Sequence, residues 1–346
     1  MDGSAMSGFT VRVRQADAPV TVEMGQTILE SALKSGVAYP HGCRSGNCGA
    51  CKSRLHAGEV EMSPYSEFAL SEKEKADGLI LACRAVPWSD CELSWLGEED
   101  LIVHPNRQLR CDVAEIAQAT HDIRIVRLNV LAGGPFDFSC GQYAAVSFSG
   151  QQPRDYSMAN TPDDPVLEFH IRRVAGGSSS AYVAEQLRVG EPVHVDGPYG
   201  TSYLRANHRG PIVAVAGGSG LAPMKSIVEA ALKSGIEQDM ALYFGVRAER
   251  DLYLEDHFRA LEHAHPNFRF VPVLSDPTGG TARRTGFVHT AVAADFRDLD
   301  GCKIYTAGPP PMVRAVQEVA VRSGARPEDI HADAFYTEAE KASLTT

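Results

Sequence analysis

Three closely spaced cysteines and a fourth far downstream are the residues of this chain best suited to chemistry. Cys43, Cys48 and Cys51 have C-x4-C-x2-C spacing, and Cys83 follows them at a distance. This is the plant-type [2Fe–2S] spacing, whereas zinc sites usually show two close pairs of ligands. Interleaved glycines allow positive φ angles and bring backbone amides near the sulfurs. We therefore expect an iron–sulfur cluster held by these four thiolates; the alternatives are a structural zinc site and unrelated reduced thiols.

The remaining cysteines are scattered along the chain. Cys91, Cys111, Cys140 and Cys302 stand in strand-like segments. Cysteine in such a context behaves as a small hydrophobic side chain. We expect all four to be buried in cores, and we treat the 12 histidines as surface or packing residues.

A second candidate site is the tetrapeptide Arg154-Asp155-Tyr156-Ser157, which falls between two expected strands. A bound flavin needs an aromatic platform, a hydrogen-bond partner at its reactive nitrogen and a cation beside its pyrophosphate. Tyr156, Ser157 and Arg154 have the side chains to supply these in turn. The alternative interpretation is a solvated loop.

Two glycine-rich turns each lead into an expected helix. The first is Gly176-Gly177-Ser178-Ser179-Ser180, and free backbone N–H groups at such a helix start favour phosphate. The second is Gly217-Gly218-Ser219-Gly220-Leu221-Ala222-Pro223, which follows an apolar strand as a nucleotide-phosphate loop does. The alternatives are a serine N-cap at the first turn and a tight-packing turn at the second.

Length and composition limit the class of protein. With 346 residues, 44% of them hydrophobic and 22% charged, the chain can form two or three globular domains. Its formal net charge of −11 argues against nucleic acid or an anionic membrane as a partner. No apolar run is long enough to span a bilayer, and no signal region begins the chain. We expect a cytoplasmic protein, because free thiols and a cluster suit a reducing compartment.

The segments before residue 98 predict a small sheet crossed by one helix. Residues 9–14, 20–23, 79–82 and 92–95 have strand patterns, and 27–35 has a helical pattern that ends at Gly36. Ser71-Glu72-Lys73-Glu74 has the spacing of a capping box and predicts a short helix. We place a first domain at residues 8–98.

The rest of the chain divides where its pattern changes. From 106 to 206 strands dominate, at 111–117, 123–130, 143–148, 166–174 and 192–195, with one helix near 179–187, which predicts an antiparallel β-barrel. From 208 to 340 apolar strands at 212–216, 240–246, 268–274, 303–307 and 331–335 alternate with helices at 224–233, 255–263, 288–295 and 312–322. Such alternation predicts a parallel α/β sheet covered on both faces.

Together these motifs resemble the ferredoxin–NADP reductase superfamily, and more closely the iron–sulfur flavoprotein reductase components of bacterial Rieske-type ring-hydroxylating dioxygenases, the naphthalene dioxygenase reductase type. Besides the cysteine loop, the resemblance rests on short motifs in order along nearly the whole chain: Gly141-Gln142-Tyr143, Arg154-Asp155-Tyr156-Ser157-Met158-Ala159, His170-Ile171-Arg172-Arg173-Val174 with Gly176-Gly177, Gly197-Pro198, Gly217 to Pro223, Tyr243-Phe244-Gly245-Val246-Arg247, Gly308-Pro309 and His331-Ala332-Asp333-Ala334-Phe335-Tyr336. It implies a β-grasp ferredoxin domain, an antiparallel flavin barrel and a parallel α/β nucleotide-binding domain.

The resemblance also implies where cofactors bind. FAD, with FMN as the alternative, would lie on the Tyr156/Ser157 shelf, with its diphosphate near Arg154, Arg172, Gly177 and Ser180. A nicotinamide nucleotide would lie over the second glycine loop, from Gly218 to Pro223. Phe335 would stand near the flavin ring. The full set of implied contacts is Arg154, Tyr156, Ser157, Met158, His170, Ile171, Arg172, Gly176, Gly177, Ser178, Ser180, Gly218, Ser219, Gly220, Pro223, Arg247, Ala307, Gly308, Pro309 and Phe335, with Tyr156, Ser157 and Phe335 as catalytic residues.

The implied function is that of an electron-transfer reductase component of a multicomponent oxygenase. NADH gives up a hydride, an oxygenase accepts electrons singly, and FAD beside a [2Fe–2S] cluster connects the two. The expected partner of this monomer is a Rieske ferredoxin or terminal Rieske oxygenase. A diiron monooxygenase or a deoxysugar dehydratase is an alternative partner, and a redox carrier or sensor with a degenerate nucleotide loop is an alternative of another class.

The choice of nucleotide depends on the charges that follow the second strand of the last domain. Arg247 and Arg250 would accept a 2′-phosphate, whereas Glu249 and Asp251 would favour a free ribose hydroxyl. The family usually takes NADH. We therefore expect NADH as the donor, with NADPH possible.

One departure from the family pattern precedes Gly308-Pro309, where most of the superfamily has cysteine and this chain has Ala307. Because this position does not supply a general base, hydride transfer should tolerate either residue. We predict that Ala307→Cys alters the rate of flavin reduction by NADH, measured by stopped flow, without abolishing it. Complete loss of reduction in the folded, flavin-loaded variant would contradict this.

Overall fold

The computed structural model describes residues 8–41, 44, 46, 49–66, 69–96, 102, 104–337 and 340. The chain divides into two compact units, of which one comprises Met1–Val103, Tyr199–Thr201 and Tyr336–Thr346 and the other His104–Pro198 and Ser202–Phe335. Among the described residues, no helix has both the length and the apolar character needed to cross a bilayer.

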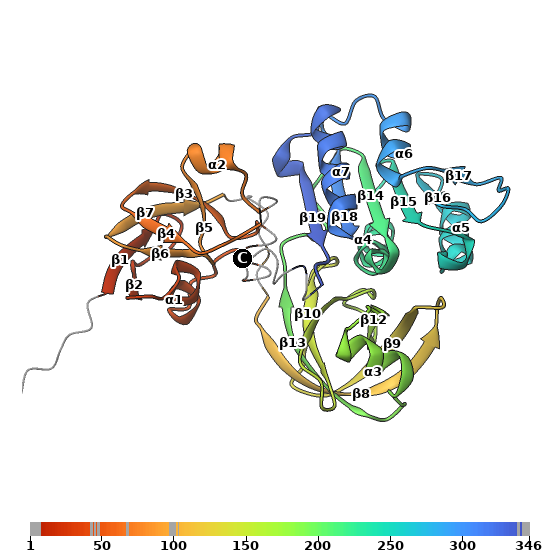
Figure 1. Ribbon diagram of the computed structural model, residues 1–346, viewed down its shortest axis with the longest axis horizontal. Coiled ribbons are helices and arrows are strands. Elements are labelled where there is room, and N and C mark those ends of the chain that lie inside the picture. Colours follow the sequence, from red (N-terminus) through yellow and green to blue (C-terminus); the bar gives the residue numbers. More distant parts are fainter. Residues whose placement is uncertain are drawn as a thin grey trace, which may run out of the picture. The chain divides into compact units, whose positions relative to one another are not determined.

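The first unit is built on a mixed five-stranded sheet with the order β2-β1-β7-β3-β5 (Figure 1). Strand β1 pairs antiparallel with β2 and parallel with β7. Helix α1 (Ile28–Lys34) buries Ile28, Leu29 and Ala32 in the core of this unit. The strands are β1 (Gly8–Val13), β2 (Val20–Glu23), β3 (Lys52–Ala57), β5 (Leu79–Leu81) and β7 (Cys91–Trp95), with β4 (Val60–Met62) and β6 (Ala85–Pro87) forming a separate antiparallel pair.

The predicted capping box of the first unit is present. Helix α2 spans Glu72–Ala76, and the Ser71 hydroxyl accepts a hydrogen bond from the Glu74 backbone N–H at 3.3 Å. The Glu74 carboxylate accepts in return from the Ser71 backbone N–H at 2.9 Å. The same reciprocal arrangement joins Thr27 and Glu30 at the start of α1, so local sequence fixes where both helices begin.

The second unit begins with the predicted antiparallel barrel. Its six-stranded sheet has the order β11-β10-β13-β8-β9-β12, and an isolated bridge joins Met158, just after β11, to Phe169 in the middle of β12. Helix α3 (Ser178–Glu185) follows β12. The strands are β8 (Arg107–Gln118), β9 (Ile123–Ala132), β10 (Tyr143–Phe148), β11 (Arg154–Ser157), β12 (Val166–Arg172) and β13 (Pro192–Tyr199).

The second unit continues with the predicted parallel sheet, whose order is β17-β16-β15-β14-β18-β19. The central strand is β14 (Ile212–Gly217), and its alternate residues face opposite cores. Ala214 and Ala216 belong to the core formed with α4 and α5, whereas Val213 and Val215 belong to the core formed with α6 and α7. These two pairs of helices cover the two faces of the sheet (Figure 1). The elements are β14 (Ile212–Gly217), α4 (Leu221–Lys233), β15 (Met240–Val246), α5 (Glu255–Ala264), β16 (Phe268–Leu274), β17 (Arg284–Thr285), α6 (Val288–Asp295), β18 (Lys303–Gly308), α7 (Pro310–Arg322) and β19 (Ile330–Ala334).

The structure corrects several predicted elements. The segment Arg154–Ser157, expected between strands, is itself strand β11, which pairs with Tyr143–Val146 of β10. Its polar residues gave no alternating apolar pattern to detect. The short strands β3, β4, β6 and β17 were not predicted either, and α4 begins at Leu221, three residues before the expected start, with Pro223 accommodated in its first turn.

The prediction that the four scattered cysteines are buried is confirmed. Cys91, Cys111, Cys140 and Cys302 are between 2% and 6% exposed. Burial raises the pKa of the Cys111 thiol to about 12 and that of Cys140 to about 11. Both side chains therefore remain neutral thiols, which is the form that packs as a hydrophobic residue.

Burial of His331 generates a prediction about pH. Its ring stacks on Tyr305 at a centroid distance of 5.2 Å, and its Nε2 atom has no hydrogen-bond partner within the described ranges. Burial, followed by the positive charge of Arg205, lowers its pKa well below the ordinary value. The unfolded chain, with a histidine pKa of about 6.5, therefore binds more protons, and the stability of this unit falls as pH drops below about 6.5.

We predict that His331→Phe, which keeps a stacking ring but cannot titrate, makes the fall in melting temperature between pH 7 and pH 5 less steep. Scanning calorimetry across that range measures the slope. His263→Phe, at an exposed position near the end of α5, should retain the parent slope. Equal slopes in all three proteins would contradict the assignment of this pH dependence to His331.

Candidate functional site

Two of the four predicted cluster ligands lie within the described residues, and they converge. Cys51 and Cys83 are 3% and 5% exposed, and the Cys83 backbone N–H donates to Cys51 Sγ at 3.4 Å. Gly46 and Gly49 have the expected positive φ angles of 77° and 72°. Cys43, Cys48 and Gly42 lie outside the described residues.

The surroundings of Cys51 and Cys83 fit an iron–sulfur cluster. Tyr39 is buried beside them, and its hydroxyl lies 2.5 Å from Ser53 Oγ, which donates to the Cys51 carbonyl at 3.1 Å. Burial raises the pKa of Tyr39, and negative charge on Cys51 and Cys83 raises it further. Two buried cysteine sulfurs, one of which accepts from a backbone amide, fit part of the four-sulfur donor set that a [2Fe–2S] cluster requires.

The expected flavin shelf lies on β11, next to the last strand of the parallel sheet. Ser157 is buried, and its hydroxyl donates to Asp333 Oδ2 of β19 at 3.2 Å. Tyr156 is half-buried and packs edge-to-face against Phe148 at 6.5 Å. Arg154 is half-buried at the start of the strand. The structure thus brings the aromatic, hydroxyl and cationic side chains onto one short strand.

Several other predicted contacts are in the interior. Met158, His170 and Ile171 are at most 4% exposed, and Met158 and Ile171 belong to the barrel core. Met158 also closes the barrel through its backbone bridge with Phe169. Their side chains therefore shape the shelf by packing rather than by presenting an exposed surface to it.

The first glycine-rich turn leads into α3 as predicted. Gly177 is the N-cap residue, no side chain caps this helix, and Gly176 has a φ of +74°. The Ser180 hydroxyl accepts from the Val174 N–H at 3.1 Å and donates to the Gly177 carbonyl at 3.2 Å, so it stabilises the turn. Ser178 begins the helix. First-turn amides without a side-chain cap fit a phosphate, and a serine N-cap is not how this helix begins.

The second glycine-rich turn lies at the crossover of the parallel sheet. From β14 the chain continues to β15 and β16 on one side, and later to β18 and β19 on the other. A Cβ on Gly220 would stand 2.1 Å from the Ala307 carbonyl oxygen. A Cβ on Gly308 would stand 2.8 Å from the Gly217 carbonyl oxygen. The strand ends therefore touch backbone to backbone, at the crevice where α/β sheets bind nucleotides.

The remaining predicted residues of the nucleotide site surround this crossover. Ser219 lies in the short 3-10 turn Gly218–Gly220, and Pro223 lies in the first turn of α4. Ala307 is fully buried, and Pro309 is the N-cap residue of α7. Phe335, half-buried just beyond β19, donates its backbone N–H to the Gly308 carbonyl at 2.9 Å.

Arg172, predicted to contact the flavin diphosphate, lies beside the nucleotide loop. Its Nη1 atom is 3.1 Å from the position that a Cβ on Gly218 would occupy, and its Nε donates to Asp122 at 2.7 Å. Burial alone would raise the pKa of Asp122, but the hydrogen bond from Arg172 lowers it. The guanidinium is thus held by a carboxylate beside the Gly218 backbone.

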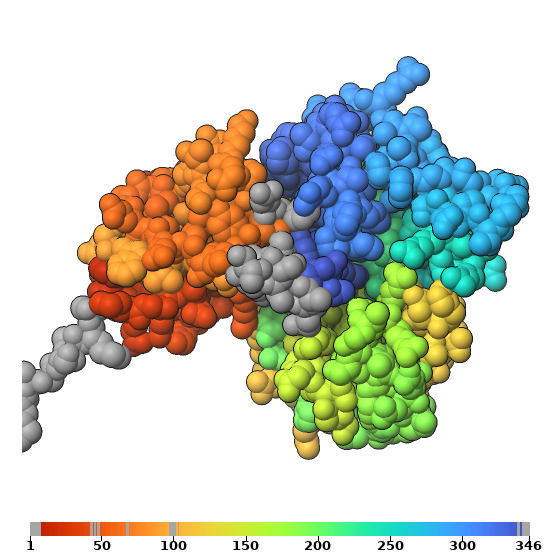
Figure 2. Space-filling model, viewed as in Figure 1, coloured from red at the N-terminus to blue at the C-terminus, as the bar shows by residue number. Residues whose placement is uncertain are grey.

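A buried charged network joins the barrel to the parallel-sheet module, which pack directly on each other (Figure 2). Glu168 accepts from Arg127 Nε at 2.8 Å and lies 3.3 Å from Lys225 of α4. His170 Nε2 is 3.1 Å from Glu168, and its Nδ1 is 3.0 Å from the Tyr253 hydroxyl. That hydroxyl also lies 3.4 Å from the Gly218 carbonyl. The network therefore ends at the nucleotide loop.

The protonation of this network follows from burial and its partners. Burial alone would raise the pKa of Glu168, but the hydrogen bond from His170 and the charge of Lys225 hold it well below its usual range. Burial lowers the pKa of His170. Glu168 is therefore ionised and His170 neutral, so His170 Nε2–H donates to Glu168.

Sequence reasoning missed Asp333, Glu168 and Tyr253 as parts of the site. Asp333 is the one carboxylate of β19, two residues before Phe335. Glu168 alone breaks the apolar run of β12 before His170. Both were visible in the sequence as carboxylates within predicted strands, whereas nothing in the sequence indicated that Tyr253 reaches His170.

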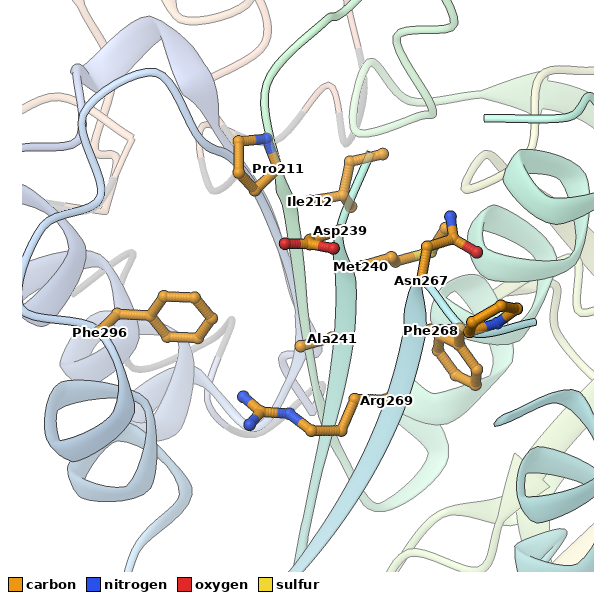
Figure 3. A pocket seen from close by; sticks show the side chains of 10 residues that line it. Pro211, Ile212, Asp239, Met240, Ala241, Asn267, Phe268, Arg269 and Phe296 are labelled. Atoms are coloured by element: carbon orange, nitrogen blue, oxygen red, sulfur yellow. The ribbon is translucent and has the colours of Figure 1, made fainter. Parts of the chain in front are cut away.

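A separate cavity of about 290 Å³ lies at the other end of the parallel sheet (Figure 3). It is lined by Ile212, Met240 and Phe268, the first residues of β14, β15 and β16. Nucleotides bind at the carboxyl ends of parallel strands, and this cavity is at their amino ends. It is therefore not part of the site described above.

Comparison with known proteins is consistent with this geometry. Residues 11–87 match the 2Fe-2S iron–sulfur cluster binding domain, 110–203 the oxidoreductase FAD-binding domain and 214–318 the oxidoreductase NAD-binding domain. The chain is 41% identical over 317 residues, 92% of this chain and 95% of that protein, to the ferredoxin–NAD(P)+ reductase component of the naphthalene 1,2-dioxygenase/salicylate 5-hydroxylase systems of Ralstonia sp.

Two further relatives extend the comparison. The reductase component of the naphthalene 1,2-dioxygenase system of Pseudomonas putida is 40% identical over 314 residues, 90% of this chain and 94% of that protein. The crystal structure of the Amycolatopsis cytochrome P450 reductase GcoB matches with a TM-score of 0.77 and 38% identity, covering 94% of this chain and 98% of that chain.

The backbone contact at the crossover generates a prediction. A methyl group on Gly220 must displace the Ala307 carbonyl, and such overpacking costs about 1–3 kcal/mol. We predict that Gly220→Ala raises the KM for NADH about tenfold or more while flavin content is unchanged. Gly280→Ala, which adds a methyl group in open space, is the matched control. A KM for Gly220→Ala equal to that of the control would refute the assigned role.

Proposed function

This chain belongs to the family of ferredoxin–NAD(P)+ reductase components that combine iron–sulfur, FAD-binding and NAD-binding domains, and we propose that it transfers electrons from NADH to a Rieske ferredoxin or a terminal Rieske oxygenase. It is an NAD(P)H-dependent oxidoreductase with a [2Fe–2S] cluster and FAD. When bound, these cofactors convert a hydride into single-electron transfers. We propose three modules at residues 8–98, 106–206 and 208–340.

The observation that carries the proposal is the meeting of the flavin shelf with the crossover of the parallel sheet. The Ser157 hydroxyl of the barrel donates to Asp333 of β19 at 3.2 Å. The Phe335 backbone N–H donates to the Gly308 carbonyl at the strand crossover. A flavin on the shelf and a nicotinamide over the loop would therefore reach the same crevice, which hydride transfer between them requires.

Each residue of the crevice has a proposed task. Tyr156 would support the flavin ring. The Ser157 hydroxyl, which donates its hydrogen to Asp333, would offer its oxygen as an acceptor to the N–H of the reduced reactive nitrogen. Phe335 would lie near the ring and exclude water from it. Arg154 and the α3 turn hold the flavin diphosphate, while Arg172 and the loop from Gly218 to Gly220 hold the nicotinamide nucleotide. No side chain is required as a general base, since hydride transfer moves no separate proton.

The partner is proposed from the relatives. Two of them are named as components of naphthalene dioxygenase systems, which favours a Rieske ferredoxin or oxygenase. GcoB is named as a cytochrome P450 reductase, so a monooxygenase of that kind is the second candidate. We propose that the chain acts as a monomer in the cytoplasm. Anaerobic mixing of the reduced protein with each purified partner discriminates between the two classes.

The proposed electron path generates a prediction about two activities. We predict that Cys83→Ser lowers bound iron and reduces NADH–cytochrome c reductase activity by about tenfold or more, because the path beyond the flavin is lost. NADH–ferricyanide activity should stay within about twofold, since that acceptor can take electrons before the cluster. Iron content, flavin content and both rates are measured on the same preparation.

Cys302→Ser is the matched control, because Cys302 is equally buried but belongs to the core of the nucleotide module. It should keep both activities. If Cys83→Ser with full flavin content reduced cytochrome c at the parent rate, the proposed path through the cluster would be wrong. If the parent protein showed no flavin reduction by NADH under anaerobic conditions, the function itself would be wrong.

A further inference from the structure

The charged turn that follows β15 lies at the expected ribose position of the nucleotide site. Gly245 of β15 pairs with Gly217, the last residue before the phosphate loop, so the residues after Val246 emerge one strand away from that loop. In α/β folds the residues at this point select between a free ribose hydroxyl and a 2′-phosphate. The charges here are Arg247, Glu249, Arg250 and Asp251.

Both carboxylates of this turn are already engaged. Glu249 Oε2 is 2.7 Å from Arg283 Nε, and its Oε1 accepts from the Thr281 hydroxyl at 3.0 Å. Asp251 Oδ2 accepts from the Ala248 backbone N–H at 2.9 Å, and its Oδ1 lies 3.5 Å from His121. Both carboxylates therefore already have partners before a ligand binds, and the negative charge of Glu249 is compensated by a guanidinium.

Arg283 is anchored on its other side as well. Its Nη1 lies 2.6 Å from Glu255 Oε1 at the start of α5, and Arg259 Nε lies 3.8 Å from the same carboxylate oxygen. Hydrogen bonds to Glu255 raise the pKa of Arg283 further. A cation shared between two carboxylates forms a network, which holds its geometry better than an isolated exposed pair.

The two arginines of the turn are open by contrast. Arg247 is exposed, with no side-chain ion pair or hydrogen bond to another described residue, and Arg250 is 76% exposed with Asp251 only at 4.0 Å. The turn thus presents cations to a ligand and keeps its anions occupied. Guanidinium groups in this state bind phosphate through charge-assisted hydrogen bonds.

We propose that the Glu249–Arg283 ion pair determines nucleotide specificity by withholding the acidic side chain that would select the unphosphorylated ribose. Arg247 and Arg250 then receive a 2′-phosphate, so the site takes the 2′-phosphorylated nucleotide as well as the free 2′-hydroxyl form. Releasing Glu249 from Arg283 makes the site selective for the nucleotide with a free 2′-hydroxyl. This inference rests on the nucleotide site of the proposed function and names its specificity-determining residues.

The test is a double-mutant cycle on the full-length holoprotein, with 5′-AMP and 2′,5′-ADP as probes that differ only in the 2′-phosphate. Calorimetry gives the ratio of their dissociation constants for the parent, Arg283→Gln, Glu249→Gln and the double variant. Arg283→Gln should disfavour 2′,5′-ADP by about fivefold or more, because a freed carboxylate then faces the phosphate. The double variant should return to the parent ratio, and Arg250→Gln should weaken 2′,5′-ADP alone.

Two results would overturn the inference. If the double variant stays as weak for 2′,5′-ADP as Arg283→Gln, Arg283 binds the phosphate itself. If Glu249→Gln weakens 5′-AMP, Glu249 already contacts the ribose. Arg322→Gln, an exposed arginine on α7, controls for loss of one positive charge. Flavin reduction by NADH, measured in the same proteins, distinguishes failure of the proposed function from failure of this inference. If the parent shows no reduction, the proposed function is wrong. If reduction is normal but the ratios of dissociation constants do not change, only this inference is wrong.

Discussion

The contact between the barrel and the parallel-sheet module contains one buried carboxylate that has charged partners in both modules. Glu168, 5% exposed, lies between Arg127 and His170 of the barrel and Lys225 of α4. A buried ion is tolerated only when its partners are in place, and removing one partner typically costs about 3–5 kcal/mol. These partners therefore help to hold the two modules together beside the crevice proposed for the flavin and the nicotinamide nucleotide, and the Tyr253 hydroxyl that contacts His170 lies 3.4 Å from the Gly218 carbonyl oxygen.

A second constraint is the absence of side chains at the strand crossover. Gly217, Gly220 and Gly308 allow the ends of β14 and β18 to meet through their backbones. Gly308 also has a φ of +142°, which other residues rarely adopt. Neighbouring atoms occupy the position of each missing Cβ, so these glycines determine how closely the strand ends pack beside the proposed nucleotide loop.

The sequence predicted those parts of the fold that depend on local patterns. The capping box at Ser71 and Glu74, the apolar run of β14 and the burial of Cys111 are local features, and the structure confirms all three. The β11 strand was missed because Arg154 and Asp155 lack an apolar alternation. The Ser157–Asp333 contact joins residues 176 positions apart, and only the chain topology brings them together.

The site was predicted most completely where glycine or cysteine spacing is itself the chemical requirement. The convergence of Cys51 with Cys83 follows from such spacing. Electrostatic partners were not predictable in the same way: Glu249 could be recognised as an acidic residue near a ribose, but its pairing with Arg283 depends on a loop 34 positions along the sequence. Long-range pairs of charged side chains carry no sequence signature.

The closure of the barrel has a consequence for where its local opening can be measured. Strand β11 has four residues and is joined to β12 only by the single Met158–Phe169 bridge among the pairings of described residues. On its other side β11 pairs with β10 along all four of its residues, so the junction with β12 is the narrower of its two pairings. The Ala159 N–H donates to the Glu168 carbonyl at 2.8 Å beside that bridge. Deuterium uptake at Ala159 would therefore report local opening of the barrel next to the proposed flavin shelf.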